Sequence, residues 1–234
     1  MRSLNSADVL WLWETGHRLH PLDKALLALQ TAFPDVQENI ADWPLGRRNR
    51  ALARLRGQLV GPQLHGWTRC RQCPEQLEFR LDGNTLAQSA VAAADERIVV
   101  GELTYRLPTS RDLTTVVSEQ DPSSAARRLL RRCCVTDSPA TTQWNEEEIN
   151  LIGERMAAAD PLAEILLRFD CPSCGSCFEE SLDLVSFLWT ELEVRARGLL
   201  RSVHRLAAAY GWSENDILSL TPVRRQAYLD MVGE

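Results

Sequence analysis

The chain lacks any hydrophobic run long enough to cross a membrane, since no segment approaches the ~18 apolar residues that a spanning helix needs. Its first residues, Met1 to Asp8, lack a basic region followed by an apolar run and a small-residue cleavage site, so we expect no signal peptide. Seven cysteines, an odd number, in a chain without an export signal favour a reducing compartment. We therefore expect a cytoplasmic protein that does not act on membranes.

The motifs of the common enzyme classes are also missing. The sequence has no phosphate-binding loop, dinucleotide fingerprint, Gly-x-Ser-x-Gly elbow or His-Glu-x-x-His segment. Its four histidines are scattered, and the run Glu146-Glu147-Glu148 is typical of a helix start. We therefore expect no enzymatic activity. A net charge of −6 at pH 7 disfavours nucleic acid and acidic membranes as partners.

Two Cys-x-x-Cys pairs, a hundred residues apart, are the strongest chemical signal in the chain. Cys70 and Cys73 form the first pair, and Cys171 and Cys174 form the second. Two such turns commonly build a closed tetrahedral zinc site, and four thiolates leave no open position for catalysis. The sequence therefore predicts structural Zn²⁺. Cys177 makes an overlapping pair with Cys174 and stays open as a substitute ligand.

The pattern of apolar residues predicts a mainly α protein with a small zinc-ribbon-like β element. Each Cys pair is followed by a short alternating segment, 77–84 after the first and 178–184 after the second, which predicts two knuckle-plus-strand units that pair with each other. Further strands are expected in 97–106, and helical spacing recurs elsewhere. We divide the chain into five segments: N-terminal helices (1–62), the first ribbon half (63–106), a helical insertion (107–170), the second ribbon half (171–184) and C-terminal helices (185–234).

Two of the predicted helices are rich in arginine. The helix 46–56 carries five arginines beside a narrow apolar stripe, and the helix that opens at Ser123 or Ser124 carries a second cluster, up to Arg132. A solvated helix face is the simpler interpretation, and a basic face that binds a partner is the alternative.

The C-terminal helices contain a distinctive set of aromatic and basic residues. One interpretation is that these residues pack the last helices onto the long helix 185–210. The other is that they form a groove for a partner protein. The candidate partner-binding residues are Trp189, Trp212, Arg224, Arg225 and Tyr228.

Several short stretches form a combined pattern. They are Pro172-x-Cys174-Gly175, Asp183 with Phe187-Leu188-Trp189, Tyr210-Gly211-Trp212-Ser213-Glu214, and Tyr105-Arg106-Leu107-Pro108-Thr109-Ser110-Arg111-Asp112-Leu113. This pattern resembles the T4-type baseplate assembly family of phages, prophages and contractile injection systems. The resemblance covers roughly residues 100–234 and the N-terminal helices only loosely. Ser176-Cys177 departs from it, because a histidine or other polar residue is expected at the first of these positions.

The resemblance implies assembly rather than chemistry. It predicts a non-enzymatic assembly factor, chaperone or minor component of a phage-like baseplate hub, acting through contacts of its helices. The implied partners are the hub, spike or tape-measure proteins of a contractile tail, and the implied location is the bacterial host cytosol. The alternative is a zinc-ribbon protein that binds nucleic acid or serves as a regulatory adaptor.

Overall fold

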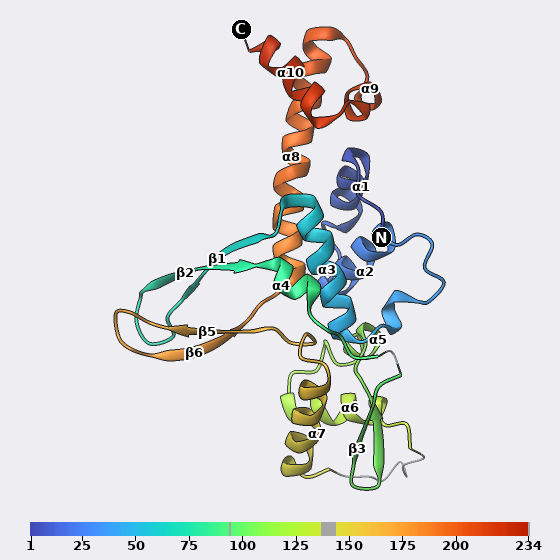
Figure 1. Ribbon diagram of the computed structural model, residues 1–234, viewed down its shortest axis with the longest axis vertical. Coiled ribbons are helices and arrows are strands. Elements are labelled where there is room, and N and C mark those ends of the chain that lie inside the picture. The colour runs from blue at the N-terminus through green and yellow to red at the C-terminus, as the bar shows by residue number, and fades with distance from the viewer. Residues whose placement is uncertain (94, 137–143, 234) are drawn as a thin grey trace. The chain divides into compact units, whose positions relative to one another are not determined.

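The structure is a computed structural model that describes residues 1–93, 95–136 and 144–233. The chain forms two compact units. The first joins residues 1–34 to residues 185–234, and the second comprises residues 35–184. The described elements are helices and three two-stranded antiparallel sheets (Figure 1), which confirms the mainly helical class.

The first unit is entirely helical, and local capping signals set its helix boundaries. Asn5 and Asp8 form a capping box at the start of the first helix, and Ser213 and Asp216 form another at the start of a later one. Gly211, at φ +70°, follows the long helix, as the sequence predicts. The elements are α1 (Ser6–Gly16), α2 (Pro21–Ala32), most of α8 (Leu184–Tyr210), α9 (Glu214–Ser219) and α10 (Pro222–Val232).

The second unit mixes short helices with β-hairpins. Its helices are η1 (Ile40–Asp42), α3 (Leu45–Val60), α4 (Gly83–Gln88), α5 (Ser110–Leu113), α6 (Pro122–Cys133) and α7 (Glu146–Ala159). Its strands are β1 (Gln63–Arg69), β2 (Gln76–Asp82), β3 (Arg97–Val100), β4 (Leu103–Arg106), β5 (Leu166–Asp170) and β6 (Cys177–Ser181). The hairpin β3–β4 packs with α6 and α7 around Tyr105, Cys133 and Ile152, which are all buried.

The two ribbon halves do not share a sheet, contrary to the strand pairing that their similar sequences predict. Instead, β1 pairs with β2 and β5 pairs with β6, and each pair is a separate hairpin. The sequence prediction missed β1. Gly66 interrupts the apolar alternation of that strand and lies opposite Phe79, so only Leu64 of β1 is deeply buried. The hairpins extend side by side from the helices of this unit (Figure 1).

Two of the five arginines of helix α3 are buried, contrary to the solvated face that the sequence favours, while Arg54 is exposed and Arg47 and Arg50 are partly exposed. Arg48 is only 7% exposed and Arg56 only 3%. Arg48 donates to Asn49 Oδ1 and Ser110 Oγ, and Arg56 donates to the carbonyl oxygens of Gly61 and Gln63. Burial lowers the pKa of Arg48 to about 10. These arginines satisfy polar groups inside the unit. Ser110 lies 62 residues from Arg48, so the sequence alone does not place the two side by side.

Asp160, which follows α7, joins that helix to the start of α3. The Gly46 N–H donates to Asp160 Oδ2 at 2.8 Å, and the Asp160 side chain is buried. Desolvation raises the pKa of this carboxyl group although the Gly46 N–H acts in the opposite direction. A Cβ atom at Gly46 would overlap Asp160 Oδ1, so the contact requires glycine.

We expect Gly46→Ala to destabilise the second unit by about 1–3 kcal/mol, because the new methyl group displaces a buried, hydrogen-bonded carboxyl group. Gly57→Ala in the same helix is the matched control, since a Cβ there meets nothing within 4 Å. The control is expected to be neutral or to stabilise the protein by up to about 1 kcal/mol through helix propensity. Urea unfolding measures both variants, and equal midpoints for the two would contradict the contact.

Candidate metal centre

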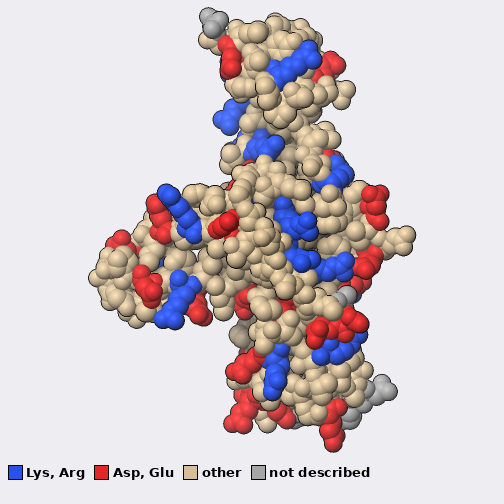
Figure 2. Space-filling model, in the orientation of Figure 1, with Lys and Arg blue, Asp and Glu red and all other residues tan. Residues whose placement is uncertain are grey.

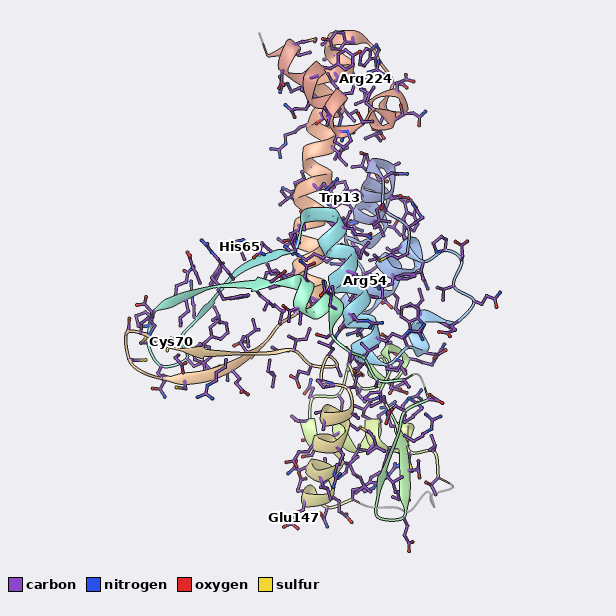
Figure 3. All side chains as sticks on the ribbon, in the orientation of Figure 1. Trp13, Arg54, His65, Cys70, Glu147 and Arg224 are labelled. Atoms are coloured by element: carbon purple, nitrogen blue, oxygen red, sulfur yellow. The ribbon has the colours of Figure 1, made fainter. Side chains whose placement is uncertain are left out.

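Both Cys-x-x-Cys pairs lie in the turns of hairpins, the first between β1 and β2 and the second between β5 and β6. Each turn contains a backbone hydrogen bond that joins residues five positions apart. The Cys70 N–H donates to the Glu75 carbonyl oxygen, and the Cys171 N–H donates to the Ser176 carbonyl oxygen, each at 2.9 Å. Gly175, at φ +72°, completes the second turn, where an L side chain would be strained. Cys70 lies near the far ends of the two hairpins (Figure 3).

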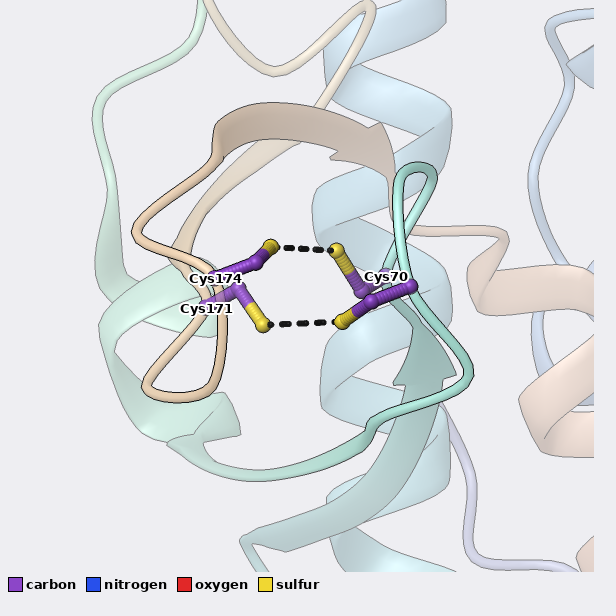
Figure 4. Close-up of side chains that lie close together, drawn as sticks. Cys70, Cys171 and Cys174 are labelled. Carbon is purple, nitrogen blue, oxygen red and sulfur yellow. Dashed lines mark hydrogen bonds between the residues drawn. The ribbon is translucent and has the colours of Figure 1, made fainter.

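The four predicted ligands come together at this point. Their sulfur atoms all lie within 4.8 Å of one another, with 3.6 Å between Cys70 and Cys174 and 3.6 Å between Cys73 and Cys171 (Figure 4). A zinc ion with Zn–S bonds of ~2.3 Å has tetrahedral edges of about 3.8 Å, so these separations fit a four-thiolate metal site. All four cysteines are free. They form a cluster that could hold a metal ion.

Neighbouring groups shift the pKa of thiols in the cluster in opposite directions. The N–H of Gln72 lies 3.4 Å from Cys70 Sγ and lowers the pKa of that thiol to about 6. The pKa of Cys73 rises to about 12 through burial and its neighbouring thiols, although the Glu75 N–H acts in the opposite direction. Four ionised thiols at these distances repel one another strongly, and a bound divalent cation removes that repulsion.

Contacts beside the sulfurs also join the two hairpins. Arg71, between the first two cysteines, donates to the Glu179 carbonyl oxygen and to Glu180 Oε2. Ser173, between the second two, donates to Glu75 Oε2 at 2.6 Å. Each knuckle therefore contacts the opposite hairpin through the residue inside its own Cys-x-x-Cys. No sequence signal pairs these residues, because Arg71 and Ser173 read as ordinary turn residues.

A small aromatic cluster packs against the cysteines. The Phe169 ring stacks on Phe178 at a centroid distance of 5.5 Å and meets Phe79 edge-on at 5.6 Å. Cys70, Cys171 and Leu77 are buried with Phe169. This cluster is small, and isolated two-stranded hairpins are marginally stable in water. We therefore expect a metal bound by the four thiols to stabilise the paired hairpins.

The remaining cysteines lie outside the cluster. Cys177 is exposed, and its thiol donates to Asp170 Oδ1 at 2.8 Å within the β5–β6 hairpin. The structure thus brings Cys171 and Cys174 to the first pair and directs Cys177 elsewhere. Cys133 is fully buried in the core around Tyr105, as the sequence predicts, and burial raises the pKa of its thiol to about 12.

The C-terminal candidates separate into buried and accessible residues. Trp189 is only 7% exposed and covers Gly16 in the first unit, so it contributes to packing and not to an exposed surface. Arg225 is also 7% exposed. Trp212 and Tyr228 are half-buried, with ring centroids 4.9 Å apart, and the exposed Arg224 (Figure 3) lies over the Tyr228 ring.

Tyr210 completes this aromatic cluster, since it stacks on Trp212 at 4.8 Å and meets Tyr228 edge-on. Beneath the rings, Leu206, Ile217 and Leu229 form a buried core. The packing interpretation therefore holds for the buried core, and binding of a partner at the rings stays a prediction. Ile217 packs the last helices together, while the aromatic rings and Arg224 remain partly accessible.

The segment 105–113, which contributes to the family resemblance, is a buried junction in the second unit. The Tyr105 hydroxyl accepts a hydrogen bond from Trp144 Nε1 at 2.9 Å, and Tyr105 is fully buried. Ser110 is fully buried and accepts from Arg48, while Arg111 forms an exposed ion pair with Asp42. The polar residues of this segment therefore hold neighbouring elements together.

Asp112 is the central residue of that junction, with a side chain that is 0% exposed. Both its oxygens accept hydrogen bonds from Arg106, at 2.6 and 2.9 Å, and Oδ1 also accepts from Arg132 Nε at 2.9 Å. Oδ2 accepts from the N–H and the hydroxyl of Thr109. Burial alone would raise the pKa of Asp112, but these donors hold it well below its usual range.

The site and fold together define a predominantly helical protein with three small hairpins and a four-cysteine cluster of metal-binding geometry. Comparison with models of protein families, with curated proteins and with solved structures finds no match to this chain. Among the helices of the described residues, none has both the length and the apolar character that a membrane span requires.

Proposed function

We propose that this protein is a non-enzymatic assembly factor whose two ribbon hairpins are held together by structural Zn²⁺. The observation that carries the proposal is the four-thiolate cluster. Cys70, Cys73, Cys171 and Cys174 supply all four ligands of a tetrahedral site, so a metal there has no open position for substrate. Zinc is the metal that this soft, all-sulfur ligand set favours outside iron–sulfur chemistry.

The proposed process is assembly of a phage-like baseplate hub in the bacterial cytosol. The resemblance of residues 100–234 to T4-type baseplate assembly proteins supports it, and so does the half-exposed aromatic cluster formed by Tyr210, Trp212 and Tyr228. Aromatic residues beside an arginine are typical of the residues that contribute most to protein–protein binding. Arg224 therefore serves as the residue that contacts a hub, spike or tape-measure protein.

Co-expression with the hub, spike and tape-measure proteins of a contractile tail tests this role. We expect the tagged protein to retain at least one of them, and we expect Arg224→Glu to reduce the retained amount about tenfold or more. Arg201→Glu is the matched control, because Arg201 is also exposed but lies on α8 outside the aromatic cluster. Failure of the wild-type protein to retain any of the three would refute the baseplate role.

The alternative, a nucleic-acid-binding ribbon, has one specific feature in its favour. Trp67 on β1 is 57% exposed, and Arg69 lies over its ring, which is an arrangement that stacks on bases. The arginine clusters lend it less support than their sequence suggests. Arg48 and Arg56 are buried, and Arg127 and Arg132 are paired with carboxylates.

Acidic and basic side chains are also interspersed on the face shown in Figure 2. Salt-sensitive binding of single-stranded DNA or RNA would favour the nucleic-acid function, and absence of binding at low salt would remove it.

A further inference from the structure

The four sulfur atoms of the cysteine cluster form two pairs that cross from one hairpin to the other (Figure 4). Cys70 Sγ lies 3.6 Å from Cys174 Sγ, and Cys73 Sγ lies 3.6 Å from Cys171 Sγ. A disulfide bond is about 2.05 Å long, so each pair has to close by only about 1.5 Å to become one. The sulfurs are therefore placed for covalent bonds between the hairpins as well as for a metal.

Each crossing pair combines an accessible sulfur with a buried one. Cys174 is exposed and its neighbour Cys70 is buried, while Cys73 is half-buried and its neighbour Cys171 is buried. An oxidant from solvent reaches the accessible member first, and the buried member then lies beside the oxidised sulfur. This division matches the two roles that thiols take in disulfide formation, in which one sulfur is oxidised and a second one resolves it.

Contacts that involve no sulfur hold the two turns together during such an exchange. Arg71 donates to Glu180 Oε2, and Ser173 donates to Glu75 Oε2. The Phe169 ring contacts an aromatic ring of each hairpin. These contacts are weak by themselves, but they keep the opposing sulfurs close until a first disulfide joins the hairpins, and the second pair then stays aligned.

We propose that the cysteine cluster is a peroxide-sensitive modification site, in which oxidation releases the metal and joins the hairpins by Cys70–Cys174 and Cys73–Cys171 disulfides. The inference rests on the proposed metal role, because it concerns the thiols that hold the metal. It goes beyond that role by giving the hairpins a second, covalent means of staying paired.

The oxidation of each pair takes two steps. The accessible sulfur attacks hydrogen peroxide, breaks its O–O bond and becomes a sulfenic acid, and the other oxygen leaves as water. The buried sulfur then attacks the sulfenic sulfur, the S–S bond forms, and the second oxygen leaves as water. The pair loses two electrons, which the peroxide gains. For four metal-bound thiolates, two peroxide molecules and four protons give two disulfides, four water molecules and a free divalent cation.

Treatment of the full-length, zinc-loaded protein with hydrogen peroxide tests the proposal. Cys177→Ser is used beside the wild type, because Cys177 lies in the same hairpin but outside the cluster. We expect about one equivalent of zinc to be released in step with the loss of four thiols, and dithiothreitol to reverse both changes. Hydrogen exchange in the two hairpins should stay slow after oxidation, whereas removal of zinc by a chelator should raise it.

Peptide mapping identifies the pairs. Trypsin cleaves between the two cysteines of the first turn, at Arg71, but nowhere between those of the second turn. Crossing disulfides therefore link the peptides 70–71 and 72–80 to the peptide 169–195, whereas a disulfide within the first turn would link 70–71 to 72–80. Fragmentation of 169–195 in the Cys177→Ser protein assigns the partner of each cysteine.

Oxidation of the chelated protein in urea is the control. Closing the short loop within one turn costs less entropy than closing a loop of 104 residues, so links within the turns should dominate in the unfolded chain. A link between Cys70 and Cys73 in the folded protein, sulfinic acid at Cys174 without cross-links, or intact thiols at roughly 1 mM peroxide that oxidises the unfolded chain would each overturn the proposal. Protein without zinc before oxidation contradicts the metal role itself, whereas zinc-loaded protein that forms no crossing disulfide contradicts this inference alone.

Discussion

Replacing Cys70 with serine is expected to reduce the zinc content of the purified protein from about one equivalent to well below half an equivalent and to unfold the paired hairpins. Serine keeps the size of the side chain but removes a thiolate, and three remaining sulfurs bind zinc far more weakly. The hairpins share no backbone ladder, and only a small cluster around Phe169 is buried between them. Structural zinc contributes about 10–16 kcal/mol of apparent folding free energy in small zinc peptides, far more than this cluster supplies.

Cys177→Ser is the control that isolates the metal. Cys177 lies in the same hairpin as Cys171 and Cys174, but its thiol faces Asp170, and serine preserves that donor. We therefore expect full zinc content and an unchanged unfolding midpoint for this variant. Elemental analysis gives the stoichiometry, and the visible spectrum of the cobalt-substituted protein reports four-sulfur coordination. Wild-type protein with less than half an equivalent of zinc, or identical unfolding of the two variants, would refute the site.

Removal of the metal by a chelator is expected to unfold the paired hairpins, as Cys70→Ser does, and to leave the rest of the unit folded. The core around Tyr105 and Ile152 belongs to the same unit but has its own buried contacts among β3–β4, α6 and α7. Hydrogen exchange in apo protein is therefore expected to rise first in β1, β2, β5 and β6, with less change in α7. This pattern would distinguish local unfolding of the two hairpins from unfolding of the whole chain.

The candidate metal ligands could be predicted from the sequence because the spacing of the cysteines is itself the signal, although it left Cys177 open as a substitute. A Cys-x-x-Cys turn presents two sulfurs to one point whatever the surrounding fold, so Cys70, Cys73, Cys171 and Cys174 needed no tertiary information. Helix ends were readable for a similar reason, since Asn5, Ser213 and Gly211 act on the backbone of their own turn. Local signals of this kind can be recognised in the sequence without knowledge of the fold.

The residues that could not be read depend on distant partners. The charge of Arg48 predicts a position at the surface. In the structure Arg48 is buried and donates to Ser110, which is far away in sequence. Trp189 is one of the predicted partner-binding residues, yet its side chain is only 7% exposed. Its burial against Gly16 depends on packing between the two ends of the chain, which no local pattern encodes. The same holds for Arg71 and Ser173, whose contacts exist only once the knuckles meet.

The family resemblance also changes meaning once the structure is known. Asp112 and Arg106 belong to the motif that suggests baseplate assembly, yet they form an ion pair, with the Asp112 carboxylate fully buried, that holds neighbouring elements of the second unit together. Residues that hold the fold together in this way say little about which partner the protein binds. The partner-binding role is therefore better sought at Arg224, which is exposed, than in segment 105–113.

Asp112→Asn is expected to destabilise the second unit by about 3–5 kcal/mol, because it removes the charge that compensates two arginines and leaves amide hydrogens facing their N–H groups. Asp42→Asn is the matched control. Asp42 also pairs with an arginine, Arg111, but both side chains are about half exposed, at 52% and 51%, so its loss should cost no more than about 1 kcal/mol. Urea unfolding at pH 7 measures both, and similar effects of the two substitutions would contradict the buried junction.

The pH dependence of the Asp112→Asn effect gives an independent check. The folded-state pKa of Asp112 lies below its unfolded value, so the stabilisation it provides is present above the unfolded pKa of about 3.9 and is lost as the pH falls below it. The difference in unfolding free energy between wild type and Asp112→Asn should therefore be constant between pH 5 and 7 and shrink as the pH falls below about 4. Release in acid of a metal bound at the cysteine cluster would affect both proteins alike, so it would cancel in this difference. A difference that does not change down to about pH 2 would mean that Asp112 is not held ionised by Arg106 and Arg132.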